Sequence, residues 1–117
     1  MTATFHELIS LSFDSRELDV YDKPIGIRQL FEDPASGAEH HLIRYPEGMS
    51  ARRHKHGVAH TIIVIEGALE VDGQVLGPGG YVHHPANTPM LHQPAPGQGT
   101  LFVIMFDGPF DVTIVDD

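Results

Sequence analysis

Short apolar runs separated by glycine and proline constrain the fold of this chain more than any other feature. The chain has 12 glycines and 9 prolines, and no long stretch keeps the 3.6-residue period of an amphipathic helix. Short runs bounded by turn residues are typical of β-strands, so we expect an all-β sandwich or barrel. At 117 residues, the chain has the usual size of one domain. The runs lie at residues 24–31, 38–45, 61–65, 69–75 and 101–106.

Two neighbouring residues mark the clearest turn. Asp72 and Gly73 both tolerate the positive φ of a type I′ turn, so residues 69–75 are predicted to form a hairpin. A short helix or turn near residues 4–11, capped by Thr4 or Thr2, is a further expectation. We divide the chain into an N-terminal extension at 1–19, containing a short helix or edge strand, and a β-barrel at 20–117.

Composition excludes several classes of function. The absence of cysteine removes disulfides, thiolate metal sites and thiol nucleophiles. Sixteen acidic against seven basic residues give a net charge of −9, which would repel nucleic acid and anionic membrane surfaces. No apolar segment is long enough to span a bilayer, and the N-terminus is acidic where a signal peptide would be basic. We therefore expect a cytoplasmic protein with neither nucleic acid nor membrane as a partner.

Nine histidines are the main chemical feature of the sequence. His54 and His56 are two residues apart, so on a strand their side chains point to the same face. A turn at Gly57 would bring His60 to the same point from the next strand. Alone, the His-x-His pair is more typical of a solvated strand than of a metal site. The third imidazole and the surrounding glycines favour a metal, because imidazole is a common ligand for transition metals.

The spacing Gly48-x5-His54-x-His56-x3-His60-x6-Gly67 resembles the first motif of the cupins, G(X)5HXH(X)3,4E(X)6G, with histidine in place of glutamate. The resemblance implies a cupin fold, a double-stranded β-helix or jelly-roll barrel, with these three histidines as metal ligands.

The second cupin motif, G(X)5PXG(X)2H(X)3N, aligns in two ways. One alignment runs from Pro78 and makes His83 the last ligand, but it leaves almost no room for the hairpin between the motifs. The other begins at Gly79, places Asn87 where the motif has glycine, and makes His92 the ligand after a two-residue shift. We prefer the second alignment, since asparagine is well suited to a left-handed turn. The expected ligand set is His54, His56, His60 and His92.

Over roughly residues 20–115 the chain is similar to the cupin domain of ChrR-type anti-sigma factors, to aryl-ketone dioxygenases and to four-histidine manganese cupins. The resemblance implies one divalent metal ion per chain: iron, manganese or zinc, with nickel and copper as further candidates. It also implies a small-molecule substrate or ligand. Because small cupins commonly pair through sheet edges, we expect a homodimer.

The leading functional hypothesis is a non-haem iron or manganese oxygenase acting on a diketone, hydroxy ketone or similar compound. The alternatives are a metal or ligand sensor without turnover, and a metal-dependent lyase or isomerase acting on a carboxylate or sugar acid. Candidate cavity residues are Arg52, Tyr81 and His83, although a solvated Arg52 at the barrel mouth is favoured. Strand alternation places His83 with Tyr81 on one face, and we assign His40 and His84 to the surface.

Overall fold

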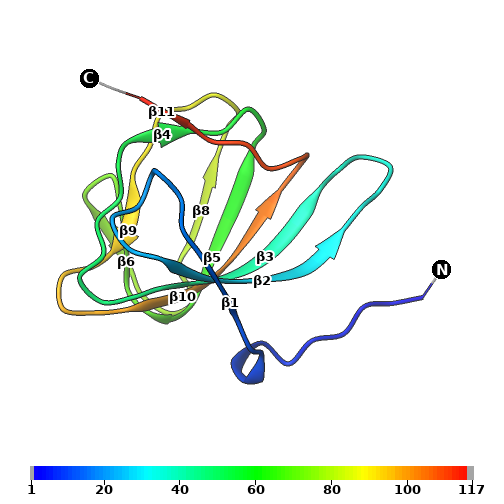
Figure 1. Cartoon of the computed structure of the whole chain (residues 1–117), viewed down its shortest axis with the longest axis horizontal. Coiled ribbons are helices and arrows are strands. Elements are labelled where there is room, and N and C mark those ends of the chain that lie inside the picture. Colours follow the sequence, from blue (N-terminus) through cyan, green and yellow to red (C-terminus); the bar gives the residue numbers. More distant parts are fainter. Residues whose placement is uncertain (1, 116–117) are drawn as a thin grey trace.

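A computed structural model describes residues 2–115 of the chain, and this part is almost entirely β-structure. The strands curve around a common interior (Figure 1). One six-stranded sheet forms most of the wall, and two smaller sheets complete it. In spatial order, the large sheet consists of β1 (Asp14–Arg16), β2 (Ile25–Glu32), β3 (Glu39–Tyr45), β10 (Thr100–Phe106), β5 (His60–Gly67) and β8 (Tyr81–His84).

The two smaller sheets carry His54 and His92. All pairings between the named strands are antiparallel. The three-stranded sheet has the order β7 (Gln74–Leu76), β6 (Leu69–Val71) and β9 (His92–Pro94), and the two-stranded sheet pairs β4 (His54–Lys55) with β11 (Thr113–Ile114). The described part of the chain is thus a β-barrel, one of the two all-β folds that the apolar runs and turns predicted and the one that the cupin resemblance implied.

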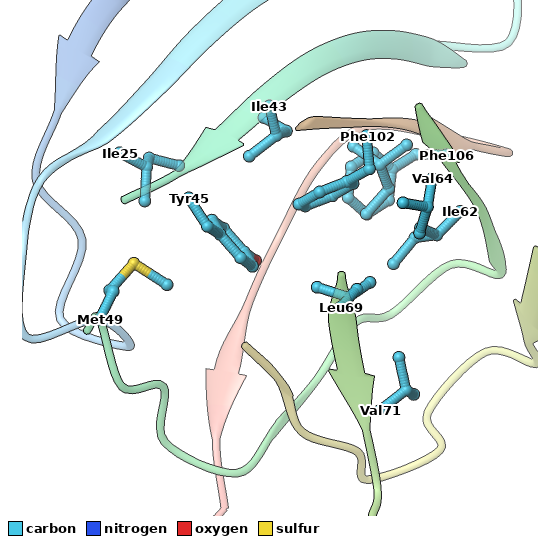
Figure 2. Close-up of a cluster of buried hydrophobic side chains, with 11 residues drawn as sticks. Ile25, Ile43, Tyr45, Met49, Ile62, Val64, Leu69, Val71, Phe102 and Phe106 are labelled. Atoms are coloured by element: carbon cyan, nitrogen blue, oxygen red, sulfur yellow. The ribbon is translucent and has the colours of Figure 1, made fainter. Parts of the chain in front are cut away.

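Alternate residues of the large sheet build the core. Along β5, Ile62 and Val64 are buried, while the residues between them are half-buried. This is the period of two that a strand with one face inward requires. Figure 2 shows these side chains meeting Phe102 of β10 and Leu69 of β6 inside the barrel. Burying side chains of this size contributes roughly 1.5–3 kcal/mol each, and it fixes the inward faces of the sheet.

The predicted hairpin and its turn are confirmed. β6 and β7 pair antiparallel, and the two connecting residues, Asp72 and Gly73, have φ of 48° and 87°. Asn87 has φ of 62°, the left-handed conformation expected where the cupin motif has glycine. Gly67 has φ of 74°, and a Cβ there would also lie 1.9 Å from the carbonyl oxygen of Gly99. The last glycine of the first motif is therefore required by close packing of two backbones.

Near the N-terminus the prediction holds only in part. A single 3₁₀ turn, η1 (Leu8–Ser10), lies within the expected range, but the residue before it is Glu7 and no side chain caps it. Capping by Thr2 or Thr4 is therefore wrong. The segment that precedes β1 lies beside the hairpin formed by β2 and β3, where His6 Nε2 bonds to the carbonyl oxygen of Leu30 at 2.8 Å (Figure 1). Within residues 2–115, no helix has the length and apolar character needed to cross a membrane.

Candidate metal centre

The first motif delivers two histidines to the barrel interior from β4 and the residue that follows it. His54 and His56 are 1% and 5% exposed, whereas Lys55 between them is half-buried. At Gly57 the backbone N–H donates to Asp111 Oδ1 over 2.7 Å, and a Cβ would lie 2.8 Å from the other carboxylate oxygen. Glycine thus allows the chain to turn closely past Asp111 before it re-enters the sheet. The shared face of the two histidines is confirmed.

The second motif brings His92 to the same place. Strand β4 forms a bridge with Met90, in which the backbone of His54 both accepts and donates at 2.8 and 2.9 Å. His92 begins β9 two residues later and is 2% exposed. One ring nitrogen from each of His54, His56 and His92 lies within 4.8 Å of the other two. We call this group the histidine triad.

Each ring of the triad is fixed by a hydrogen bond at Nδ1. His54 Nδ1 donates to the carbonyl of Arg52 over 2.8 Å, and His56 Nδ1 donates to the carbonyl of Asp111 over 2.5 Å. His92 Nδ1 bonds to the Tyr45 hydroxyl at 2.8 Å. Carbonyl oxygens only accept, so Nε2 of His54 and His56 carries the lone pair. This arrangement, in which an outer partner orients each imidazole, is that of metal-ligating histidines.

The second ring nitrogens of the triad fit a metal ion. Nε2 of both His56 and His92 is buried and has no hydrogen-bond partner within residues 2–115. Burial lowers the pKa of His54 to about 4 and holds the pKa of His92 well below its ordinary value, and neighbouring imidazoles reinforce both effects. Burial also lowers the pKa of His56, although its bond to Asp111 opposes this. The rings are therefore neutral near pH 7, which is the state that binds metals.

The third histidine of the first motif lies against the triad. His60 is 1% exposed, and its ring centroid is 4.7 Å from that of His56 and 6.1 Å from that of His92. In the described part of the chain, neither of its ring nitrogens has a hydrogen-bond partner. On its other side His84 stacks at 4.9 Å. Burial lowers the pKa of His60 to about 3, so this ring is also neutral. Its nitrogens do not belong to the group that lies within 4.8 Å.

Strand β8 shows the opposite orientation from the one expected. Tyr81 and His83 do share a face, but it is the outer one: Tyr81 is 62% exposed, and His83 is exposed and bonds to Thr61 Oγ1 at 3.0 Å. His84 is 7% exposed and pairs in register with His60. The placement of Tyr81 and His83 in a cavity and of His84 on the surface is therefore wrong. Alternation groups residues by face without showing which face is inside.

The remaining candidates are placed as follows. Arg52 is exposed, in keeping with a solvated residue near the barrel mouth. His40 is half-buried, and its ring lies 5.2 Å from that of Phe31. Of the two alternatives for the second motif, His92 lies beside His54 and His83 does not.

An apolar cavity of about 60 Å³ adjoins the triad. His56 and His92 line it at one end, and the inward residues of β2, β3 and β10 form much of the remaining wall. At least 10–15 Å³ is needed for one water, so the space admits a few waters or a small organic molecule. Tyr45, which lines the cavity and bonds to His92, was not predicted from the sequence. Its hydroxyl also bonds to that of Tyr21 at 2.5 Å. No local spacing relates Tyr45 and His92, which are 47 positions apart in the sequence.

Comparison with known proteins agrees with this geometry. The barrel is a cupin fold, and the family described as the ChrR cupin-like domain matches residues 13–111, so the chain belongs to that family. A search of curated proteins found no match.

Several solved structures share the fold. A candidate acetylacetone dioxygenase from Methylibium petroleiphilum superposes with a TM-score of 0.80 at 18% identity, covering 99% of this chain and 83% of that one. The acetylacetone dioxygenase of Acinetobacter johnsonii gives 0.76 at 18% identity, covering 100% and 83%. ChrR of Rhodobacter sphaeroides, in complex with SigE, gives 0.65 at 17% identity, covering 80% of this chain and 48% of that one.

Proposed function

We propose that this protein is a metal-dependent oxygenase that acts on a small oxygenated organic compound such as a diketone or hydroxy ketone. One divalent ion would be held by Nε2 of His54, His56 and His92, with His60 as a fourth donor. The observation that carries the proposal is the convergence of three buried, oriented imidazoles beside an apolar cavity.

The protein residues supply orientation and electrostatics for such an ion. When bound, iron or manganese supplies Lewis acidity and redox chemistry. An all-histidine set contributes no negative charge, so the centre keeps its full positive charge and favours anionic or chelating ligands. The hydroxyls of Tyr45 and Tyr21 stay protonated, because burial raises the pKa of Tyr21 to about 12 and that of Tyr45 well above its ordinary value.

The cavity wall limits what can bind. Phe102, Phe106 and Phe110 line it and exclude bulk water from the side that faces the triad. Its volume favours a substrate of few heavy atoms over a flavonol or a sugar chain. The likeness to acetylacetone dioxygenases supports the fold. The volume of the cavity supports a small substrate.

The test begins with metal analysis of the purified protein by mass spectrometry. Protein loaded with iron, manganese or zinc is then given acetylacetone, a hydroxyacetophenone and a flavonol while oxygen is followed with an electrode. We expect oxygen uptake with the small ketones in the iron or manganese form. The proposal would be contradicted if the purified protein held zinc alone and if the iron, manganese and zinc forms all failed to consume oxygen with every compound.

A second candidate is a sensor module that holds metal without turnover. The family match and the likeness to ChrR favour it. In this case, metal loading would change the affinity for a regulatory protein, measurable by calorimetry, and no product would form. A lyase or isomerase would be distinguished by turnover that persists without oxygen. The homodimer, the cytoplasmic location and the division after residue 19 stay predictions, and light scattering would measure the first.

A further inference from the structure

The cavity wall formed by β3 carries a pair of polar residues, Glu39 and His41, that lie outside the triad. Four alternate residues of this strand line the cavity, and the pair Glu39 and His41 stands at one end of the row while Tyr45 stands at the other. His41 is 7% exposed, and its ring packs edge-on to Phe106 at 6.4 Å. The side of Phe106 towards the triad packs against His56 at 5.1 Å. The pair is therefore separate from the triad but shares its cavity.

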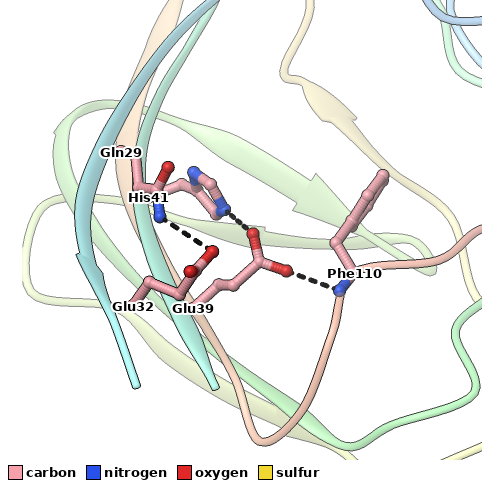
Figure 3. A network of polar contacts seen from close by, with 5 residues as sticks. All are labelled: Gln29, Glu32, Glu39, His41 and Phe110. Carbon is pink, nitrogen blue, oxygen red and sulfur yellow. Dashed lines mark hydrogen bonds and ion pairs between the residues drawn. The ribbon is translucent and has the colours of Figure 1, made fainter. Parts of the chain in front are cut away.

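Glu39 fixes the His41 ring. Figure 3 shows one carboxylate oxygen on His41 Nε2, at 3.1 Å, and the other on the backbone N–H of Phe110, at 2.7 Å. An ionised carboxylate only accepts hydrogen bonds, so His41 Nε2 carries a proton. In the neutral ring the lone pair is then on Nδ1.

His41 Nδ1 is buried and has no partner among the described residues. It lies on the ring edge that points away from Glu39 (Figure 3). A second proton on this nitrogen would leave a buried N–H without an acceptor, which is costlier than an unfilled lone pair. Because His41 lines the cavity, Nδ1 is a buried acceptor that a hydrogen-bond donor entering the cavity would satisfy.

We infer that His41, oriented by Glu39, is a subsite that accepts a hydrogen bond from a hydroxyl group of the substrate. The inference rests on the proposed function to the extent that the cavity holds the substrate, and it narrows the substrate class. A hydroxy ketone presents a carbonyl for the triad side of the cavity and a hydroxyl for His41. A diketone bound as its enolate has no hydroxyl to donate.

The first test measures the protonation of His41 directly. Long-range ¹H–¹⁵N spectra of the metal-free protein, assigned with a His41→Asn variant, distinguish the two neutral tautomers and the imidazolium. We expect the tautomer with hydrogen on Nε2. Hydrogen on Nδ1, in either the neutral or the charged ring, would overturn the inference. The measurement needs no activity and no bound metal.

The second test uses a matched pair of probes, hydroxyacetone and methoxyacetone, whose binding to the zinc-loaded protein is followed by NMR titration. One buried hydrogen bond predicts roughly a five- to tenfold preference for hydroxyacetone. His41→Leu should remove this preference, whereas His41→Asn, with an amide oxygen near the position of Nδ1, should keep part of it. Gln74→Ala is the control, because Gln74 is exposed on β7, a strand that does not line the cavity.

Equal binding of the two probes, failure of hydroxyacetone to bind, or a preference that survives His41→Leu would overturn the inference. A hydroxyl preference that depends on His41, in a protein that consumes no oxygen, would leave the subsite standing and contradict only the oxygenase.

Discussion

The triad and the neighbouring His60 are equally buried, yet they differ in how their rings are held. Each triad ring has a hydrogen bond at Nδ1 that leaves Nε2 directed to a common point. His60 has no hydrogen bond at either nitrogen to any residue that the structure describes, and its ring packs against His56, Phe106 and His84. Burial makes a histidine neutral, but an outer partner makes it a defined ligand. The triad should therefore dominate metal binding, with His60 contributing less.

The largest expected effect is the loss of the metal when one triad ring is removed. His56→Ala should reduce bound metal from about one ion per chain to a trace, because only two of the three triad ligands then remain, with His60 as a weaker donor. Mass spectrometry of the dialysed protein measures it. His83→Ala, which removes an exposed histidine, is the matched control and should retain the metal. Equal metal content in the two variants would show that the triad does not hold the ion.

The metal-free protein should lose stability in mild acid. Burial holds the pKa of His54 at about 4 and of His60 at about 3, whereas both are near 6.5 when unfolded. Between these values the unfolded state binds more protons, so the free energy of unfolding falls as the pH falls below 6.5. At pH 4.5 the protonation of His54 in the unfolded state alone lowers the free energy of unfolding by about 2.5 kcal/mol.

Urea unfolding between pH 7 and 4.5 isolates this effect from the carboxylates. Asp33, whose pKa is lowered by its hydrogen bonds to Ala35 and Ser36, loses its contribution only below its ordinary value of 3.8. A stability that is constant across this pH range would show that these rings are not buried as neutral groups.

Removal of an orienting partner should weaken metal binding without abolishing it. Tyr45→Phe keeps the ring in the core but deletes the hydroxyl on His92 Nδ1. We expect metal affinity to fall roughly 10- to 100-fold, measured by competition with a chelator. Tyr81→Phe removes an exposed hydroxyl and is the control. An unchanged affinity in Tyr45→Phe would show that ring orientation is set by packing alone.

The smallest effects should come from His60 and His84, which pack against each other beside the triad. His60→Leu should lower metal affinity roughly tenfold, near the lower limit of what an outer partner contributes. His84→Leu should change it less, since His84 contacts His60 and lies outside the triad. The same competition assay ranks the two variants beside His56→Ala. Complete loss of metal in His60→Leu would make His60 the equal of the triad, and no change would remove it from the ligand set.

The sequence alone determined those features that depend on neighbouring residues. Asp72 and Gly73 specify their hairpin because few other residues adopt positive φ. His54 and His56 share a face because strands alternate with a period of two. The order of apolar runs and turns was sufficient for an all-β fold, and the motif spacing was needed to choose a barrel over a sandwich.

Only the tertiary structure decided which face of a strand is inside and which distant residues meet. His84 rather than His83 faces inward because β8 pairs with β5 in a register that sets His84 opposite His60; a slip of one residue would have reversed them. The contact of Tyr45 with His92 arises from closure of the barrel, which joins residues with no local relation. A period of two gives the same sequence pattern for either face of a strand, and only the packing of the core decides which face is buried.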